Sequence, residues 1–145
     1  MGSRSAGCVA LVALYIAVAV GGCGQRSGTA QVRGRVLMKD GSVPTGAVAV
    51  VRFQPAVDST APVRKAASAE IEKDGHFEAY TRKPGDGVFV GQYDVTFSVL
   101  EDGTNSNSSR IDPKYNKSRT TPYHVTIEDD VSDLEFELEP PLAKK

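Results

Sequence analysis

Two histidines, His76 and His124, are the only candidates in the sequence for acid-base work near neutral pH. They could act as an acid and a base or bind a metal ion. A zinc site, however, needs three or four ligands, and neither histidine has a Cys or His neighbour at ligand spacing. The sequence also contains no G-x-S-x-G or H-E-x-x-H motif. We therefore expect no catalytic residue, no metal site and no cofactor, and we expect that the protein is not an enzyme.

The most distinctive stretch of the chain, residues 11–23 (LVALYIAVAVGGC), ends at a cysteine whose thiol could be modified. It belongs to an uncharged apolar run over residues 8–20 that follows Arg4. As a helix this run covers about 20 Å, less than the roughly 30 Å of a bilayer's hydrocarbon core. The pattern is typical of a cleaved export signal. An uncleaved N-terminal anchor and a plain secreted protein stay as alternatives, and both place the rest of the chain outside the cytoplasm.

The last four residues of this stretch, Val20-Gly21-Gly22-Cys23, resemble the lipobox of bacterial lipoproteins. The resemblance implies that residues 1–22 are removed as a lipoprotein signal peptide and that Cys23 carries fatty acyl chains such as palmitate. Each buried CH₂ of such a chain contributes about 0.8 kcal/mol, so the membrane becomes a partner of the protein. Gly24 stands where lipoproteins retained at the inner membrane tend to have Asp, which favours the outer membrane or the periplasmic face of the cell envelope.

The residues after the signal are enough for one domain and carry nearly balanced charge. Removing residues 1–22 from 145 leaves 123, a size suited to a single domain. Cys8 leaves with the signal, so Cys23 is the remaining cysteine and no internal disulfide can form. Without Arg4, 16 basic residues face 18 acidic ones. This balance gives no general attraction for nucleic acid, and we expect no nucleic-acid partner.

Alternating apolar and polar residues predict seven short strands after residue 30. The strongest lies at residues 92–100, where every second residue is apolar: Tyr93, Val95, Phe97 and Val99. The others are predicted at 31–39, 47–53, 66–72, 76–80, 123–127 and 133–138, separated by Asp-Gly pairs, prolines and polar loops. Each strand has one apolar face that must be buried. The pattern therefore predicts an all-β fold, a seven-stranded two-sheet sandwich.

The order of the turn and strand motifs resembles small bacterial envelope lipoproteins with a carboxypeptidase regulatory-like, or transthyretin-like (prealbumin-like), β-sandwich. The motifs are Val32-x-Gly34-x-Val36, Asp40-Gly41, Pro44-x-Gly46-Ala47, Val51-x-Phe53-x-Pro55, Asp74-Gly75-x-Phe77, Pro84-Gly85-Asp86-Gly87, Gly91-x-Tyr93-x-Val95 and Pro113-Lys114-Tyr115. Residues 88–90 depart from the small residues and prolines usual in the family. The resulting domain organisation is a flexible tether at 23–30, the β-sandwich at 31–139 and a tail at 140–145.

The fold implied by this resemblance places the first and last strands side by side. Cations of the first strand would then face acids of the last, namely Arg33, Arg35 and Lys39 against Glu135, Glu137 and Glu139. Two activities of related folds are not expected. The chain ends LEPPLAKK and lacks the C-terminal Tyr-Arg-Gly-Ser of hydroxyisourate hydrolases. Its last strand lacks the Asn for an isopeptide bond of the Cna protein B type, for which Lys39 and Asp133 would be conceivable.

The best candidate for a recognition surface is the long polar loop at residues 110–123. Four cations of this loop surround one aromatic ring: Arg110, Lys114, Lys117 and Arg119 around Tyr115. Long loops without secondary structure of their own are often functional. This ligand-contact loop could bind a polysaccharide, an acidic partner or lipid head groups. Alternatively, Ile111 and Tyr115 only fix the loop to the edge of the sandwich.

These patterns predict a non-enzymatic, membrane-anchored envelope lipoprotein whose β-sandwich is a structural or adhesive module. The alternative function is a carbohydrate- or calcium-binding module at the envelope surface, since Asp-containing turns offer oxygen ligands to calcium. The expected partners are the membrane, through Cys23, and an envelope polysaccharide or protein.

Overall fold

The computed structural model describes residues 28–143, so the signal, Cys23 and the last two residues lie outside the described range. Within it the chain is nearly all β, with one short 3₁₀ helix and no α-helix. The elements are β1 (Thr29–Ala30), β2 (Val32–Met38), β3 (Val48–Pro55), β4 (Ala67–Glu70), β5 (His76–Ala79), β6 (Val88–Phe89), β7 (Gly91–Leu100), η1 (Pro113–Asn116), β8 (His124–Ile127) and β9 (Val131–Leu138).

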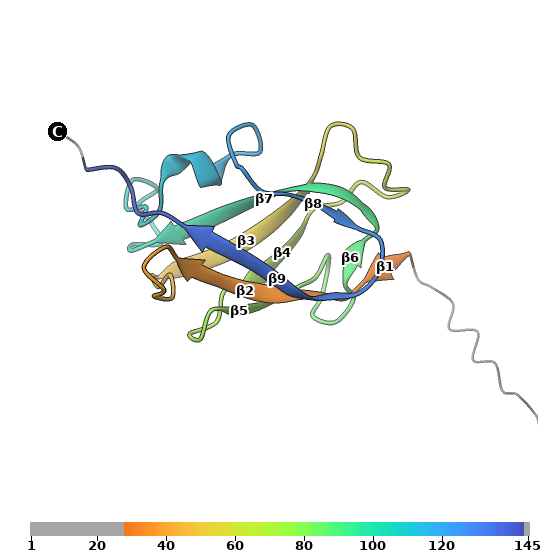
Figure 1. Ribbon diagram of the computed structural model, residues 1–145, viewed down its shortest axis with the longest axis horizontal. Coiled ribbons are helices and arrows are strands. Elements are labelled where there is room, and N and C mark those ends of the chain that lie inside the picture. Colours follow the sequence, from red (N-terminus) through yellow and green to blue (C-terminus); the bar gives the residue numbers. More distant parts are fainter. Residues whose placement is uncertain (1–27, 144–145) are drawn as a thin grey trace, which may run out of the picture.

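Two sheets pack against one another, and a third small sheet lies at one end (Figure 1). The larger sheets have the strand orders β5-β2-β9 and β4-β3-β7-β8, and β1 pairs with β6. The strands β2 and β9 run parallel side by side, which confirms the predicted neighbourhood of the first and last long strands. Every other strand pair in the described range is antiparallel. The fold is therefore the all-β, sandwich-like domain that the sequence predicts.

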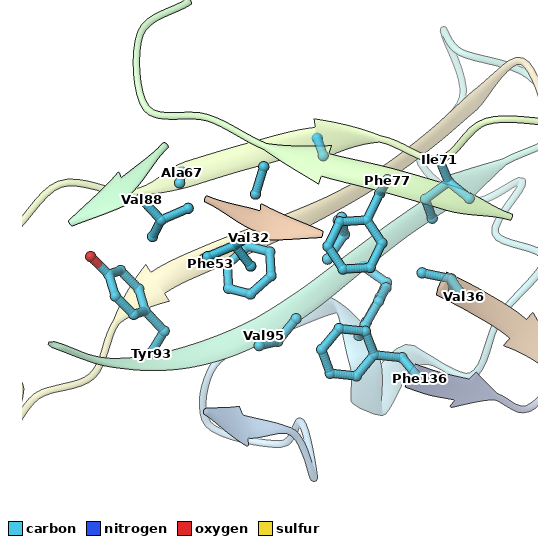
Figure 2. Packing of buried hydrophobic residues seen from close by; sticks show 14 of the residues in the cluster. Val32, Val36, Phe53, Ala67, Ile71, Phe77, Val88, Tyr93, Val95 and Phe136 are labelled. Atoms are coloured by element: carbon cyan, nitrogen blue, oxygen red, sulfur yellow. The ribbon is translucent and has the colours of Figure 1, made fainter. Parts of the chain in front are cut away.

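The core is built from side chains that alternate along strands of both larger sheets (Figure 2). The strand β7 buries the four residues of the predicted apolar face, Tyr93, Val95, Phe97 and Val99. Phe77 of β5 lies between two other rings, with centroids 6.0 Å from Phe53 of β3 and 6.0 Å from Phe136 of β9. Burying each such side chain contributes roughly 1.5–3 kcal/mol. This core is the main source of stability, because residues 28–143 contain no cysteine.

The predicted count of seven strands is too low, because the described residues contain nine. The additional strands, β1 and β6, have two residues each and pair Thr29 with Phe89 and Ala30 with Val88. Tyr93 fixes β6, since its hydroxyl donates to the Phe89 carbonyl oxygen at 2.7 Å. The strand β1 lies in the range predicted as tether, so the folded domain begins before residue 31.

The predicted charge pairing between β2 and β9 occurs at the end of the two strands. Lys39 Nζ lies 3.1 Å from Glu139 Oε1. Arg33 instead pairs with Glu78 of β5, at 3.0 Å, because β2 is the central strand and has a neighbour on each side. Arg35 stands opposite Glu135 in the register, but its Nε donates to the Asp74 carbonyl oxygen. Exposed ion pairs of this kind contribute about 0–1 kcal/mol each.

Candidate functional site

The predicted ligand-contact loop follows β7, and its helical turn η1 lies at the end of the sandwich opposite β1 (Figure 1). Ile111 is fully buried and Tyr115 is 3% exposed. The Tyr115 ring meets Phe97 edge to face, with centroids 6.3 Å apart, and stacks on Tyr123 at 6.0 Å. The interpretation that Ile111 and Tyr115 fix the loop to the sandwich is thus confirmed. The Tyr115 ring is not part of the exposed surface.

Short side chains hold the rest of this polar loop in place. The Asp112 carboxylate accepts a hydrogen bond from the Lys114 backbone N–H at 2.9 Å and caps η1, whose first turn begins with Pro113. Thr120 Oγ1 donates to the Lys114 carbonyl oxygen at 2.7 Å, and Thr121 Oγ1 donates to the Val95 carbonyl oxygen at 2.6 Å. The loop is therefore connected at several points to itself and to β7, although its composition is that of an unstructured segment.

Tyr123 joins the two larger sheets where the loop enters β8. Its hydroxyl donates to the Glu137 carbonyl oxygen at 2.5 Å and accepts from the Glu137 N–H at 3.0 Å. One side chain thus satisfies both backbone groups that Glu137 presents on the open edge of β9. Burial raises the pKa of Tyr123, which keeps the hydroxyl protonated and able to donate.

The predicted cations of the loop have different surroundings. Lys114 Nζ lies 2.5 Å from Glu139 Oε2, and Glu139 also pairs with Lys39, so one carboxylate bridges two lysines. The hydrogen bond to Glu139 raises the pKa of Lys114, and the hydrogen bonds from Lys114 and Lys39 lower the pKa of Glu139. Lys114 Nζ also lies 4.9 Å from the centre of the Tyr115 ring. The lysine therefore covers the outer side of the ring.

The three remaining cations of the loop differ in whether they form an ion pair. Arg110 pairs with Glu101 at 3.0 Å. Lys117 and Arg119 are exposed and take part in no ion pair with any described residue. Beside Arg110 an open groove of about 510 Å³ is lined by Met38, Pro44 and Pro141, among others. The structure thus brings Arg110 and Lys114 to the same end of the sandwich but assigns them to separate ion pairs.

The two histidines lie on different sheets, and each has an acidic partner. His76 Nδ1 lies 3.0 Å from Asp74 Oδ2, and His124 Nδ1 lies 2.8 Å from Asp94 Oδ1. Both histidine side chains are exposed, at 59% and 63%. Over residues 28–143, no group of three or more His, Cys, Asp or Glu side chains is arranged to hold a metal ion.

The structure contains a further exposed feature, which the sequence patterns did not indicate, in the loop between β3 and β4. Val57 is 92% exposed, one of two large hydrophobic side chains in the described range with such exposure; the other is Leu142 in the tail. The Arg64 guanidinium donates to the Ala56 carbonyl oxygen at 2.7 Å and to the Val57 carbonyl oxygen at 3.2 Å. The sequence shows a single valine between Pro55 and Pro62. Because it belongs to no alternating pattern, the sequence does not predict whether its side chain is buried or exposed.

Cys23, the predicted lipidation site, precedes the described residues. Among the residues that are described, no helix has both the length and the apolar character needed to cross a membrane. Comparisons with protein-family models, with curated proteins and with solved structures find no match to this chain.

Proposed function

We propose that the protein is a non-enzymatic envelope lipoprotein, held on a membrane by acyl chains at Cys23, whose β-sandwich is a structural or adhesive module. The short apolar segment before Cys23 supports the anchor, because it fits an export signal and is too short to span a bilayer comfortably. We also propose that the domain is of the transthyretin-like, carboxypeptidase regulatory-like kind. The parallel pairing of β2 with β9 supports this assignment, since that fold has its first and last strands side by side.

One observation carries the proposal: the distance along the chain between Cys23 and the first strand is very short. The strand β1 begins at Thr29, six residues after Cys23. Six residues span at most about 20 Å even when fully extended. A lipid on Cys23 would therefore hold the folded domain directly against the membrane surface. A stalk that projected it into the surroundings would need a longer linker.

The test is the chemical state of the N-terminus in cells. Intact mass analysis of the purified full-length product should show the loss of residues 1–22 and the mass of acyl chains on the new N-terminal cysteine. The chain should be found with membranes, and C23A should not incorporate labelled palmitate. A product that keeps Met1 or carries no lipid would refute the proposed anchor.

The second candidate function is carbohydrate or calcium binding at the envelope surface. The open groove beside Arg110 and the exposed Lys117 and Arg119 favour a polysaccharide with acidic groups over calcium. A glycan array on residues 24–145 tests this function, with a calcium titration in parallel. Saturable glycan binding that is lost in the double variant K117A and R119A would support it. Because Tyr115 is buried, substituting it would disturb the core and would not report on binding.

A further inference from the structure

At the end of the sandwich where β1 lies, residues 56–57 of the loop between β3 and β4 form a tip with one exposed apolar side chain. Val57 is 92% exposed, so burying it elsewhere removes almost its whole side chain from water. Both carbonyl oxygens at the tip, those of Ala56 and Val57, already accept hydrogen bonds from Arg64. A carbonyl without a partner would make entry into a lipid environment costly. For these two carbonyl oxygens that cost is absent.

The tip lies close to the start of the domain. The Val90 N–H donates to the Gly28 carbonyl oxygen, and two residues later the Gln92 carbonyl oxygen accepts from the Ala56 N–H. Through these bonds Ala56 lies within roughly 15 Å of Gly28, given about 3.3 Å per residue in a strand. Figure 1 shows the loop between β3 and β4 at the same end of the sandwich as β1. The loop between β3 and β4 and the first described residue, Gly28, therefore lie at the same end of the sandwich.

The charges at this end are of both signs. Cations and acids lie together in the loops next to β1, which connect β3 to β4, β5 to β6 and β8 to β9. The cations are Arg64, Lys65, Arg82 and Lys83, and the acids are Asp58, Asp86, Glu128, Asp129 and Asp130. A groove of about 570 Å³ at this end is lined by both Arg82 and Asp130, together with Phe89. Such a surface has no preference for an anionic bilayer, but it suits head groups that carry one charge of each sign.

We propose that this end docks on a zwitterionic lipid surface, with Val57 inserted among the head groups. The inference rests on the proposed function, because the acyl chains on Cys23 bring the tip to the bilayer. One valine favours the docked state only about tenfold, which is too little for a free protein. The acyl chains already hold the anchored domain at the bilayer, so docking is a change of orientation within one molecule, and a tenfold preference then favours the docked orientation. The domain then has a defined orientation, with η1 and the tail pointing away from the membrane.

The test uses single tryptophan reporters, since the chain contains no Trp. V57W and the matched control L142W, at a position 83% exposed at the other end, are prepared as residues 23–145. Cys23 is coupled to a maleimide lipid in vesicles of phosphatidylcholine and phosphatidylethanolamine. We expect the emission of V57W to shift to the blue and to be quenched by shallow doxyl lipids several-fold more than that of L142W. Equal and water-like emission from both reporters would overturn the proposal.

Two further measurements identify what covers Val57. In the unmodified chain, attachment to vesicles should slow amide exchange at residues 56–65, and V57D should lower the docked-to-undocked ratio roughly tenfold. Docking should persist between low and high salt, whereas dependence on anionic lipid would overturn the zwitterionic assignment. A concentration-dependent blue shift of V57W without vesicles would show instead that a second copy covers the tip. Because the lipid is attached chemically, these outcomes do not depend on whether cells acylate Cys23.

Discussion

Gly34 allows β2 and β9 to lie side by side, and its replacement by alanine should destabilise the domain strongly. A Cβ atom at this position would lie 2.2 Å from the Leu134 carbonyl oxygen and 2.8 Å from Phe77 Cε1. An ordinary contact needs at least 3.4 Å, so β9 would have to move by about 1.2 Å. The register of β2 and β9 shifts at this point, between Val32 and Gly34. The backbone there is already irregular and has little room to adjust.

The size of the effect follows from two contributions. Overpacking a filled core costs about 1–3 kcal/mol, and each strained or lost backbone hydrogen bond adds about 1 kcal/mol. With one such hydrogen bond affected, we expect G34A to lower the free energy of unfolding by about 2–4 kcal/mol. For a domain of this size, 1 kcal/mol corresponds to about 4 °C, so the melting temperature should fall by roughly 8–16 °C.

The assay is thermal and denaturant unfolding of residues 24–145, followed by circular dichroism. The matched control is G103A, because a Cβ at Gly103 would meet only the Val48 side chain at 3.3 Å and Ala47 at 4.0 Å. It should stay within about 0.5 kcal/mol of the unmodified protein. If G34A were equally neutral, the close approach of β9 at Gly34 would be refuted, and with it the packing of β2 against β9.

Two further predictions concern the loop end of the domain. Y123F removes the hydroxyl shared by the Glu137 N–H and C=O and should cost about 1–3 kcal/mol, with faster amide exchange at Glu137. Y80F is the control, since the Tyr80 hydroxyl has no hydrogen bond within residues 28–143, and equal stability of the two variants would contradict the role of Tyr123. The hydrogen bonds from Lys114 and Lys39 lower the pKa of Glu139, so their stabilisation is complete above its ordinary value near 4.5 and is lost as the pH falls below it. E139Q should therefore be less stable than the unmodified protein at pH 7, and the difference should shrink as the pH falls below 4.5; a stability difference independent of pH would exclude this linkage.

The alternation of apolar and polar side chains was enough to predict the long strands. In β7 the apolar residues alternate without interruption, and the predicted range of 92–100 differs from Gly91–Leu100 by one residue. The strand β9 begins two residues before its predicted start at 133, because Val131 and Ser132 break the alternation. The strands β1 and β6 could not be predicted in this way. Each has two residues, and they form only because distant parts of the chain meet.

The candidate site was harder to predict than the fold, because composition does not say which way a side chain points. The cations around Tyr115 were compatible with a ligand surface and with a simple fixing of the loop. The burial of Ile111 and Tyr115 shows that these two side chains fix the loop, whereas ligand contact by the exposed cations stays a prediction. One signal could have indicated this outcome. Asp112 followed by Pro113 is a helix start, and the turn that begins there carries Tyr115 toward the core. The Arg64 hydrogen bonds that shape the Val57 tip have no signature in the sequence.

The proposed membrane anchor would bring copies of the protein close together, and the open edge of β9 is protected against pairing with another copy. Anchoring on a membrane concentrates molecules in two dimensions, where an unpaired strand edge can join another copy. The Tyr123 hydroxyl occupies both backbone groups of Glu137, and the Asp112 N–H donates to the Glu139 carbonyl oxygen. Toward the start of β9, Asp133 and Glu135 are exposed and would repel the same strand of another copy. Hydrogen bonds thus block strand pairing at the end of β9, around Glu137, and like charges oppose it at the start, around Asp133 and Glu135.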